Sequence, residues 1–114
     1  MEYALLIYET EDDVTLRGKE DHTHAYLSYM DALKAAGVFA GASYLQPAFT
    51  ATSVQVESGK RHVQDGPVSA SKEQLGGVML INVPDLDAAL DWAARCPGSR
   101  CRVEIRPLVP SDGD

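Results

Sequence analysis

GGVMLINVPDLDAALDWAARCPG, residues 76–98, is the stretch that decides the fold. Its first eight residues, 76–83, are strongly apolar and predict a strand, which Pro84 ends because proline has no amide hydrogen for a strand ladder. Asp85 is placed to cap a following helix, because its carboxylate can accept hydrogen bonds from backbone N–H groups of the first turn. Cys96-Pro97-Gly98 ends that helix. The stripe expected to face the core is Leu86, Ala89, Leu90 and Ala93, with Trp92 beside it.

The same order of strand and helix is found at the start of the chain. EYALLIYE, residues 2–9, alternates as a strand with Tyr3, Leu5 and Ile7 on one face and Ala4, Leu6 and Tyr8 on the other. After an acidic loop at residues 10–17, a helix is predicted from about Gly18 to Ala36, with Gly37 suited to the left-handed position after its end. Its core-facing stripe is His22, Tyr26, Tyr29, Met30 and Leu33.

Three further segments complete the pattern. Residues 38–45 predict a strand, residues 51–64 a polar hairpin that turns at Ser58-Gly59, and residues 101–109 a last strand. The polarity of the hairpin places it at a sheet edge or projecting from the body. The order β-α-β-hairpin-β-α-β is typical of an α+β sandwich of the ferredoxin-like type, an antiparallel sheet with two helices on one face. We expect one domain over residues 1–109 and a flexible acidic tail over residues 110–114.

Two helices cover only one face of such a sheet. Residues 2–9 and 78–83 are nevertheless apolar on both faces, and an exposed apolar sheet of this size is unusual for a monomer. We therefore expect a second copy on the open face, which makes the protein a homodimer.

Composition excludes several classes of partner. The net charge is -7, and Lys60-Arg61 is the sole adjacent basic pair, which argues against nucleic acid and against anionic membranes. No apolar run is long enough for a signal peptide or a membrane span, so a cytoplasmic location is expected. Cys96 and Cys101 are then expected to be free thiols rather than a disulfide. No motif indicates a cofactor or a metal site.

His22 is the most interesting titratable residue. Its place on the helix stripe directs it toward the sheet, where a partly buried imidazole suits proton transfer; a packing or capping role is the favoured alternative. Tyr8 and Tyr44 stand near strand ends, where their hydroxyls suit the mouth of a pocket, although packing is the commoner role. Arg106 suits an internal ion pair better than an anionic ligand.

HVQDGPVSASKEQLGG, residues 62–77, joins the hairpin to a central strand. Asp65 is a candidate catalytic acid, but Asp before Gly-Pro more often forms a turn with its own side chain. Gly76-Gly77 opens a strand rather than a helix, so close backbone packing or a bulge is a better account than a phosphate loop.

Several stretches resemble the DGPF branch of the YCII-related proteins. They are MEYALLIYE, AAGVFAGASYLQP, DGPVSASKEQLGG, VPDLDAALDWAARCP and VEIRPLV, and together they cover nearly the whole chain in order. The chain departs from the branch at Val68, where phenylalanine gives the motif its name, and at Ala70 and Ala88, where acids are usual. Val68 implies a smaller plug over whatever lies beneath the turn.

The resemblance implies a ferredoxin-like fold assembled as a dimeric α+β barrel. Most of the branch has no established activity; related proteins are suggested to use a His–Asp pair near the first helix, and one is a dehydrochlorinase of chlorinated hydroquinones. Tyr26 stands at the position aligned with that histidine, one helical turn after His22, and Ala35 stands near the aspartate. Genes of the branch often neighbour those of extracytoplasmic-function sigma factors.

Two hypotheses follow. In the first, a small aromatic or anionic molecule binds near the first helix in a pocket formed with Tyr8, Tyr26, Tyr44, Pro67 and Val68, with acid–base chemistry through His22 and Asp65. In the second, the protein is a non-catalytic interaction module of a sigma-factor regulatory system. The first requires His22 to lie in a concave site with a polar partner within hydrogen-bond reach.

Overall fold

The strand and helix predicted from residues 76–98 are both present in the computed structural model, which describes residues 1–97 and 102–110. Strand β5 (Gln74–Asn82) is followed by helix α3 (Leu86–Ala94). The Asp85 carboxylate accepts a hydrogen bond from the backbone N–H of Ala88 at 2.9 Å, as an N-terminal cap does. The predicted cap is therefore confirmed.

The other elements follow the predicted order, with two short helices added. In chain order they are β1 (Glu2–Glu9), α1 (Glu11–Thr15), α2 (Glu20–Ala35), β2 (Phe39–Tyr44), the 3-10 helix η1 (Ala48–Thr50), β3 (Thr52–Glu57), β4 (Lys60–Asp65) and β6 (Arg102–Pro107).

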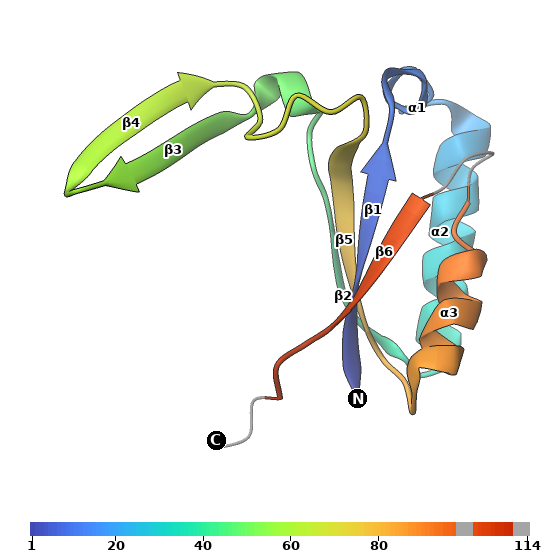
Figure 1. The fold of residues 1–114 in the computed structure, drawn as a ribbon. Coiled ribbons are helices and arrows are strands. Elements are labelled where there is room, and N and C mark those ends of the chain that lie inside the picture. The colour runs from blue at the N-terminus through green and yellow to red at the C-terminus, as the bar shows by residue number, and fades with distance from the viewer. Residues whose placement is uncertain (98–101, 111–114) are drawn as a thin grey trace.

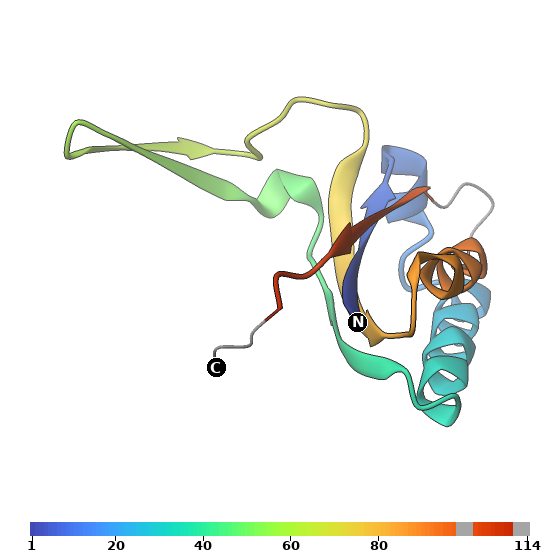
Figure 2. The same ribbon diagram turned by 60° about the horizontal axis from the view of Figure 1, so that its bottom comes forward.

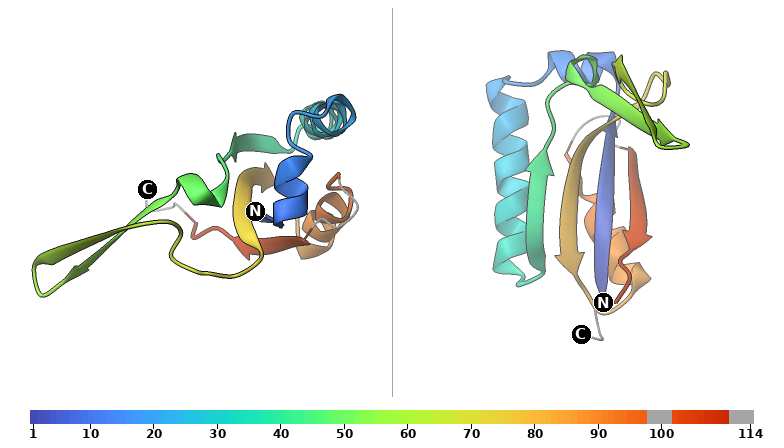
Figure 3. Two further views of the ribbon diagram at one scale, coloured as in Figure 1. Left: turned by 90° about the horizontal axis from the view of Figure 1, so that it is seen from above. Right: turned by 90° about the vertical axis from the view of Figure 1, so that its left-hand side faces the viewer.

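Four strands form an antiparallel sheet in the order β2-β5-β1-β6. Helices α2 and α3 lie side by side on one face of this sheet, and the other face is open (Figures 1 and 3). The architecture is α+β and compatible with the predicted ferredoxin-like fold. Strands β3 and β4 form a separate two-stranded sheet that projects from the body (Figure 2).

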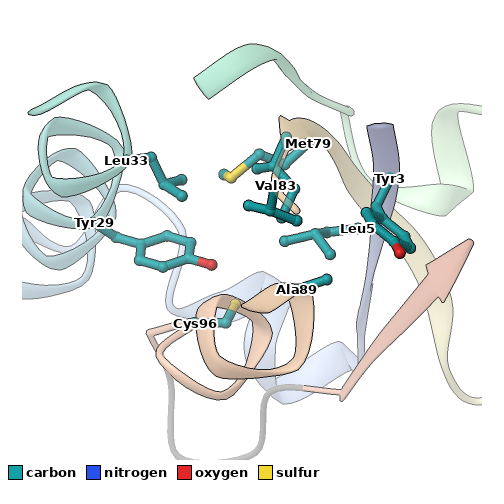
Figure 4. Packing of buried hydrophobic residues seen from close by; sticks show 9 residues of the cluster. Tyr3, Leu5, Tyr29, Leu33, Met79, Val83, Ala89 and Cys96 are labelled. Carbon is teal, nitrogen blue, oxygen red and sulfur yellow. The ribbon is translucent and has the colours of Figure 1, made fainter. Parts of the chain in front are cut away.

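The core lies between the helices and the covered sheet face (Figure 4). Tyr3 and Leu5 of β1 are buried there, while Leu6 of the same strand faces the open side opposite Val78 of β5. The two-faced alternation predicted for residues 2–9 is thus confirmed. The buried members of the core are Tyr3, Leu5, Tyr29, Leu33, Met79, Ile81, Val83, Ala89 and Cys96.

The phase of α3 differs from the prediction. Ala89 is fully buried, and Ala88, Trp92 and Ala93 pack against the core, but Leu86 and Leu90 are about half exposed. Trp92 packs against the core partly buried, and its backbone carbonyl accepts a 2.6 Å hydrogen bond from the Tyr29 hydroxyl. Burial raises the pKa of that hydroxyl, and the nearby Arg95 opposes the rise.

The segment predicted as an acidic loop contains helix α1. Thr10 and Asp13 form a capping box: the Thr10 Oγ1 accepts from the Asp13 N–H, and the Asp13 carboxylate accepts from the Thr10 N–H at 2.8 Å. These reciprocal bonds satisfy backbone donors that would otherwise be free at the start of the helix. The prediction of a loop was therefore wrong for residues 11–15.

Other predictions have mixed outcomes. Gly37 adopts a φ of 74° directly after α2, as expected, and Arg106 donates to Glu104 at 2.6 Å in the expected internal ion pair. Cys96 is disulfide-bonded, which corrects the expectation of a free thiol; Cys101 lies outside the described residues, as do residues 111–114 of the predicted tail. No helix in the described ranges is long and apolar enough to cross a membrane.

Candidate binding site

A cavity of about 280 Å³ lies between α2 and the neighbouring ends of β1, β2 and β5, next to α1. Most of its surface is apolar, and its aliphatic lining comes from both the helix and the sheet. The aliphatic residues around it include Ile7, Leu16, Leu27, Met30 and Met79. A concave apolar site with a few polar groups is the usual form of a small-molecule site.

An ion pair forms one wall of the cavity. Glu9 ends β1 and is the one charged residue that is buried among those the structure describes. Arg17, which follows α1, grips it with two donors: Nε donates to Oε2 at 3.2 Å and Nη2 to Oε1. A buried carboxylate needs such a partner, because an unpaired charge away from water is very costly.

Arg17 is also held by two other groups of the chain. Its Nη1 donates to the backbone carbonyl of Leu45, and its guanidinium lies 4.3 Å from the ring centroid of Tyr44. Each end of the guanidinium is therefore occupied, and its face rests on an aromatic ring. Arg17 is thus part of the wall of the cavity rather than a free cation.

Gly76 makes room for Glu9. A Cβ atom at this position would lie 2.6 Å from the Glu9 Cδ, closer than real Cβ contacts. The pairing of β1 with β5 shifts its register between Ile7 and Tyr8, at the same point of the sheet. The expected bulge and close packing at Gly76-Gly77 are both confirmed, since a Cβ at Gly77 would lie 3.3 Å from the Ser43 carbonyl oxygen.

Three aromatic side chains continue the wall from Arg17. The rings of Tyr44 and Tyr26 are stacked with centroids 6.1 Å apart and planes inclined by 24°. The ring of His22 meets Tyr26 edge to face with centroids 5.1 Å apart. Arg17, Tyr44, Tyr26 and His22 therefore form one continuous series from the end of β2 to the start of α2.

The tyrosine hydroxyls are held in the protonated form. Burial raises the pKa of Tyr26 to about 12, and the charges of Tyr44, Glu9 and Asp13 add to the rise. Burial also raises the pKa of Tyr44, although Arg17 acts in the opposite direction. Both phenols are hence neutral hydrogen-bond donors near pH 7.

Tyr26 also approaches the disulfide sulfur of Cys96, at 3.7 Å from hydroxyl oxygen to Sγ. Since a disulfide sulfur carries no hydrogen, the hydroxyl is the donor in this weak contact. Pro97, the next residue, lines the cavity.

The structure brings four of the seven predicted site residues to the cavity: His22, Tyr26, Tyr44 and Tyr8. His22 is half-buried in a concave site, but its imidazole makes no hydrogen bond to any residue in the described part of the chain. The site therefore has the concave shape that acid–base chemistry through His22 requires, but the described residues supply no polar partner for the imidazole.

The other three predicted residues lie elsewhere. Asp65 ends β4 and is exposed, Pro67 lies two residues later and is half-buried, and Val68 is 88% exposed. None of the three lines the cavity. A single chain therefore does not form the predicted pocket in which the Asp65-Gly66-Pro67 turn lies beside the first helix.

The prediction from sequence missed Glu9, Asp13 and Arg17, all of which line the cavity. Local signals for them were present: Glu9 is an acid that ends a largely apolar strand, and Arg17 is the first base after the acids Glu9, Glu11, Asp12 and Asp13. Their pairing depends on how α1 folds back toward β1.

Comparison with known proteins gives the family. The model of the YCII-related domain matches residues 1–111. A protein of Rhizobium meliloti (strain 1021), described as uncharacterized, is 33% identical over 116 residues, which cover 96% of this chain and 93% of that protein. The chain belongs to the YCII-related family, as its sequence motifs predict.

Proposed function

We propose that the cavity binds a small, uncharged aromatic molecule. The observation that carries the proposal is the bonding of Arg17: each of its three side-chain nitrogens already donates a hydrogen bond to Glu9 or Leu45. The charged residues of the lining are Glu9, Asp13 and Arg17, so the lining bears a net negative charge. An anionic ligand would meet this charge in a partly desolvated site, and an uncharged one would not.

The rest of the lining fits an aromatic ring. Stacked Tyr26 and Tyr44 offer aromatic surface together with neutral hydroxyl donors, and the aliphatic side chains offer apolar surface. A cavity of about 280 Å³ is small even for such sites, which favours a ligand of one ring. His22 is then the residue available for acid–base chemistry on that ligand, because its imidazole nitrogens are not bonded to other described residues.

We propose in addition that the protein is a homodimer of the dimeric α+β barrel type. Leu6, Val78 and Leu80 lie on the sheet face that carries no helix, and a second copy placed there would cover them.

The experiment is a thermal-shift titration with matched single-ring ligands. Benzyl alcohol and benzoate have the same ring but differ in charge. Benzyl alcohol is expected to raise the melting temperature; at 100 times its Kd a ligand stabilises the folded state by about 2.7 kcal/mol. Benzoate is expected to have little effect.

Two variants locate the binding. Tyr44→Ala removes an aromatic wall and is expected to abolish the shift, whereas His62→Ala, on the exposed strand β4, is expected to preserve it. An equal or larger shift with benzoate, or a shift with benzyl alcohol that Tyr44→Ala leaves intact, would refute the proposal.

A further inference from the structure

The β3–β4 hairpin, which we call the arm, has an apolar face that is exposed and has no partner among the residues the structure describes. Val54 pairs directly with Val63 in the antiparallel register, and Val56 lies on the same face. The three valine side chains are 60%, 58% and 69% exposed, respectively. A two-stranded hairpin is at best marginally stable alone in water, so a surface of this kind needs a cover.

The arm is held at a defined angle by its base. The Ser53 hydroxyl donates to the Gly66 carbonyl and the Gly66 N–H donates to the Ala51 carbonyl, each at 2.7 Å. Gly66 adopts a φ of 105°, a backbone conformation that glycine adopts readily and that residues with a Cβ atom rarely adopt. At the tip, Ser58 and Gly59 have φ values of 51° and 76°, which suit a tight two-residue hairpin turn. The arm is therefore a built element and not a loose loop.

The surface of the chain is too large for a compact monomer. The chain exposes 7981 Å², whereas a compact monomer of its mass exposes about 6,100 Å². Its radius of gyration is 16.0 Å, whereas a compact domain of this length has about 13 Å. The excess surface, about 1,900 Å² on one chain, is in the range that each subunit of an obligate homodimer buries.

Charge indicates which partner the arm can approach. Residues 52–65 contain Glu57, Lys60, Arg61 and Asp65, so their formal charges cancel and the net -7 belongs to the rest of the chain. Arg61 lies opposite Val56 on the apolar face. An arm with no net charge and with a cation near its tip can approach an acidic body, such as a second copy, without the repulsion that two bodies of this charge exert on each other.

From these observations we infer that the arm clasps a second copy of this chain, with the face of Val54, Val56 and Val63 packed against the partner and the two arms acting reciprocally. The inference rests on the proposed homodimer and names the element that holds it together. The open sheet face supplies the apolar surface of the body, and the arm supplies surface that extends beyond its edge (Figure 2).

The test compares two pair substitutions on opposite faces of the arm. Val54→Lys with Val63→Glu places opposite charges on the directly paired positions of the valine face. Gln55→Lys with His62→Glu does the same on the other face, at the next paired positions of the hairpin. Both variants keep a favourable cross-strand pair, so the hairpin itself is preserved.

Size-exclusion chromatography with light scattering then gives the mass in solution. Wild type and the Gln55/His62 variant are expected at twice the 12.3 kDa of the chain. The Val54/Val63 variant is expected to dissociate, with a dimer Kd raised on the order of 100-fold, as for the loss of central contact residues. Circular dichroism checks that the helices of the body are retained in both variants.

Leu80→Lys, on the open sheet face, separates this inference from the proposed dimer. Dissociation of Leu80→Lys while the Val54/Val63 variant stays dimeric would overturn the role of the arm and leave the dimer standing. A wild-type monomer would overturn both. Hydrogen exchange of the β3 and β4 amides gives an independent readout: protection is expected to rise with protein concentration, and protection that does not depend on concentration contradicts the inference.

Discussion

Gly76→Ala tests the close packing on which the cavity wall depends. The φ of Gly76 is not in the left-handed region, so the backbone itself accepts alanine, and the cost is steric. The new Cβ would lie 2.6 Å from the Cδ, 2.9 Å from the Cγ and 2.9 Å from the Oε1 of Glu9. Either the strands move apart or the Glu9 carboxylate leaves Arg17.

The loss of stability expected for Gly76→Ala lies between the costs of two better-known kinds of substitution. Forcing an extra methyl into a packed site costs about 1–3 kcal/mol, and breaking a buried ion pair costs about 3–5 kcal/mol. Because the end of a glutamate side chain can shift part of the way, we expect Gly76→Ala to lower the free energy of unfolding by about 2–4 kcal/mol. Urea unfolding at a fixed protein concentration measures this loss, and fixed concentration matters if the folded state is a dimer.

The control is the same substitution in a background that lacks the ion pair, Glu9→Ala with Arg17→Met. There the added methyl meets no carboxylate, and alanine restricts the unfolded chain, so Gly76→Ala is expected to be neutral or to stabilise by up to about 1 kcal/mol. An equal loss in both backgrounds would refute the argument that Gly76 exists to admit Glu9.

Two further predictions concern the same wall. Arg17→Met leaves the buried Glu9 unpaired and is expected to lower the free energy of unfolding in urea by about 3–5 kcal/mol. The control, Arg102→Met, breaks the ion pair between Glu73 and Arg102, a side chain that is 76% exposed, and is expected to cost less than about 1 kcal/mol. Equal losses in the two variants would show that burial does not set the difference. Tyr26 keeps its proton to about pH 12 when folded, while an unfolded tyrosine ionises near 10.0, so stability is expected to fall as pH rises through this window, because the unfolded state binds fewer protons. Tyr26→Phe is expected to flatten that part of the stability profile, and an unchanged profile would contradict the assignment.

Features that depend on neighbouring residues were predictable from sequence. Pro84 and Asp85 mark the end of β5 and the cap of α3, and the alternation of residues 2–9 gives the two faces of β1. The Ser58-Gly59 turn likewise lies between paired residues Glu57 and Lys60. The stripe in the sequence predicts Leu86 and Leu90 as core residues of α3, whereas in the fold Ala88, Ala89 and Trp92 face the core and the two leucines are about half exposed.

The cavity wall was not predictable in the same way, because its parts meet only in the folded chain. Glu9, Arg17 and Gly76 belong to a strand end, a segment after a short helix and a distant strand. No spacing along the sequence relates Gly76 to Glu9; the antiparallel register of β1 and β5 does, at the point where it shifts. The tyrosines and His22 were found because helix periodicity and strand ends direct them to one region.

The segment Asp65-Gly66-Pro67-Val68 gains a different role from the one its prominence in the sequence suggests. It does not line the cavity; instead Gly66 makes the two backbone and side-chain contacts that join the arm to its base. Strand β3 has six residues, so at about 3.3 Å per strand residue the tip of the arm lies roughly 20 Å from its base. A small change of angle at the Gly66 turn therefore displaces the tip by a larger distance. In the proposed dimer the turn therefore governs where Val54 and Val63 meet the partner, so a substitution such as Gly66→Ala should weaken association more than it weakens binding of a ligand in the cavity.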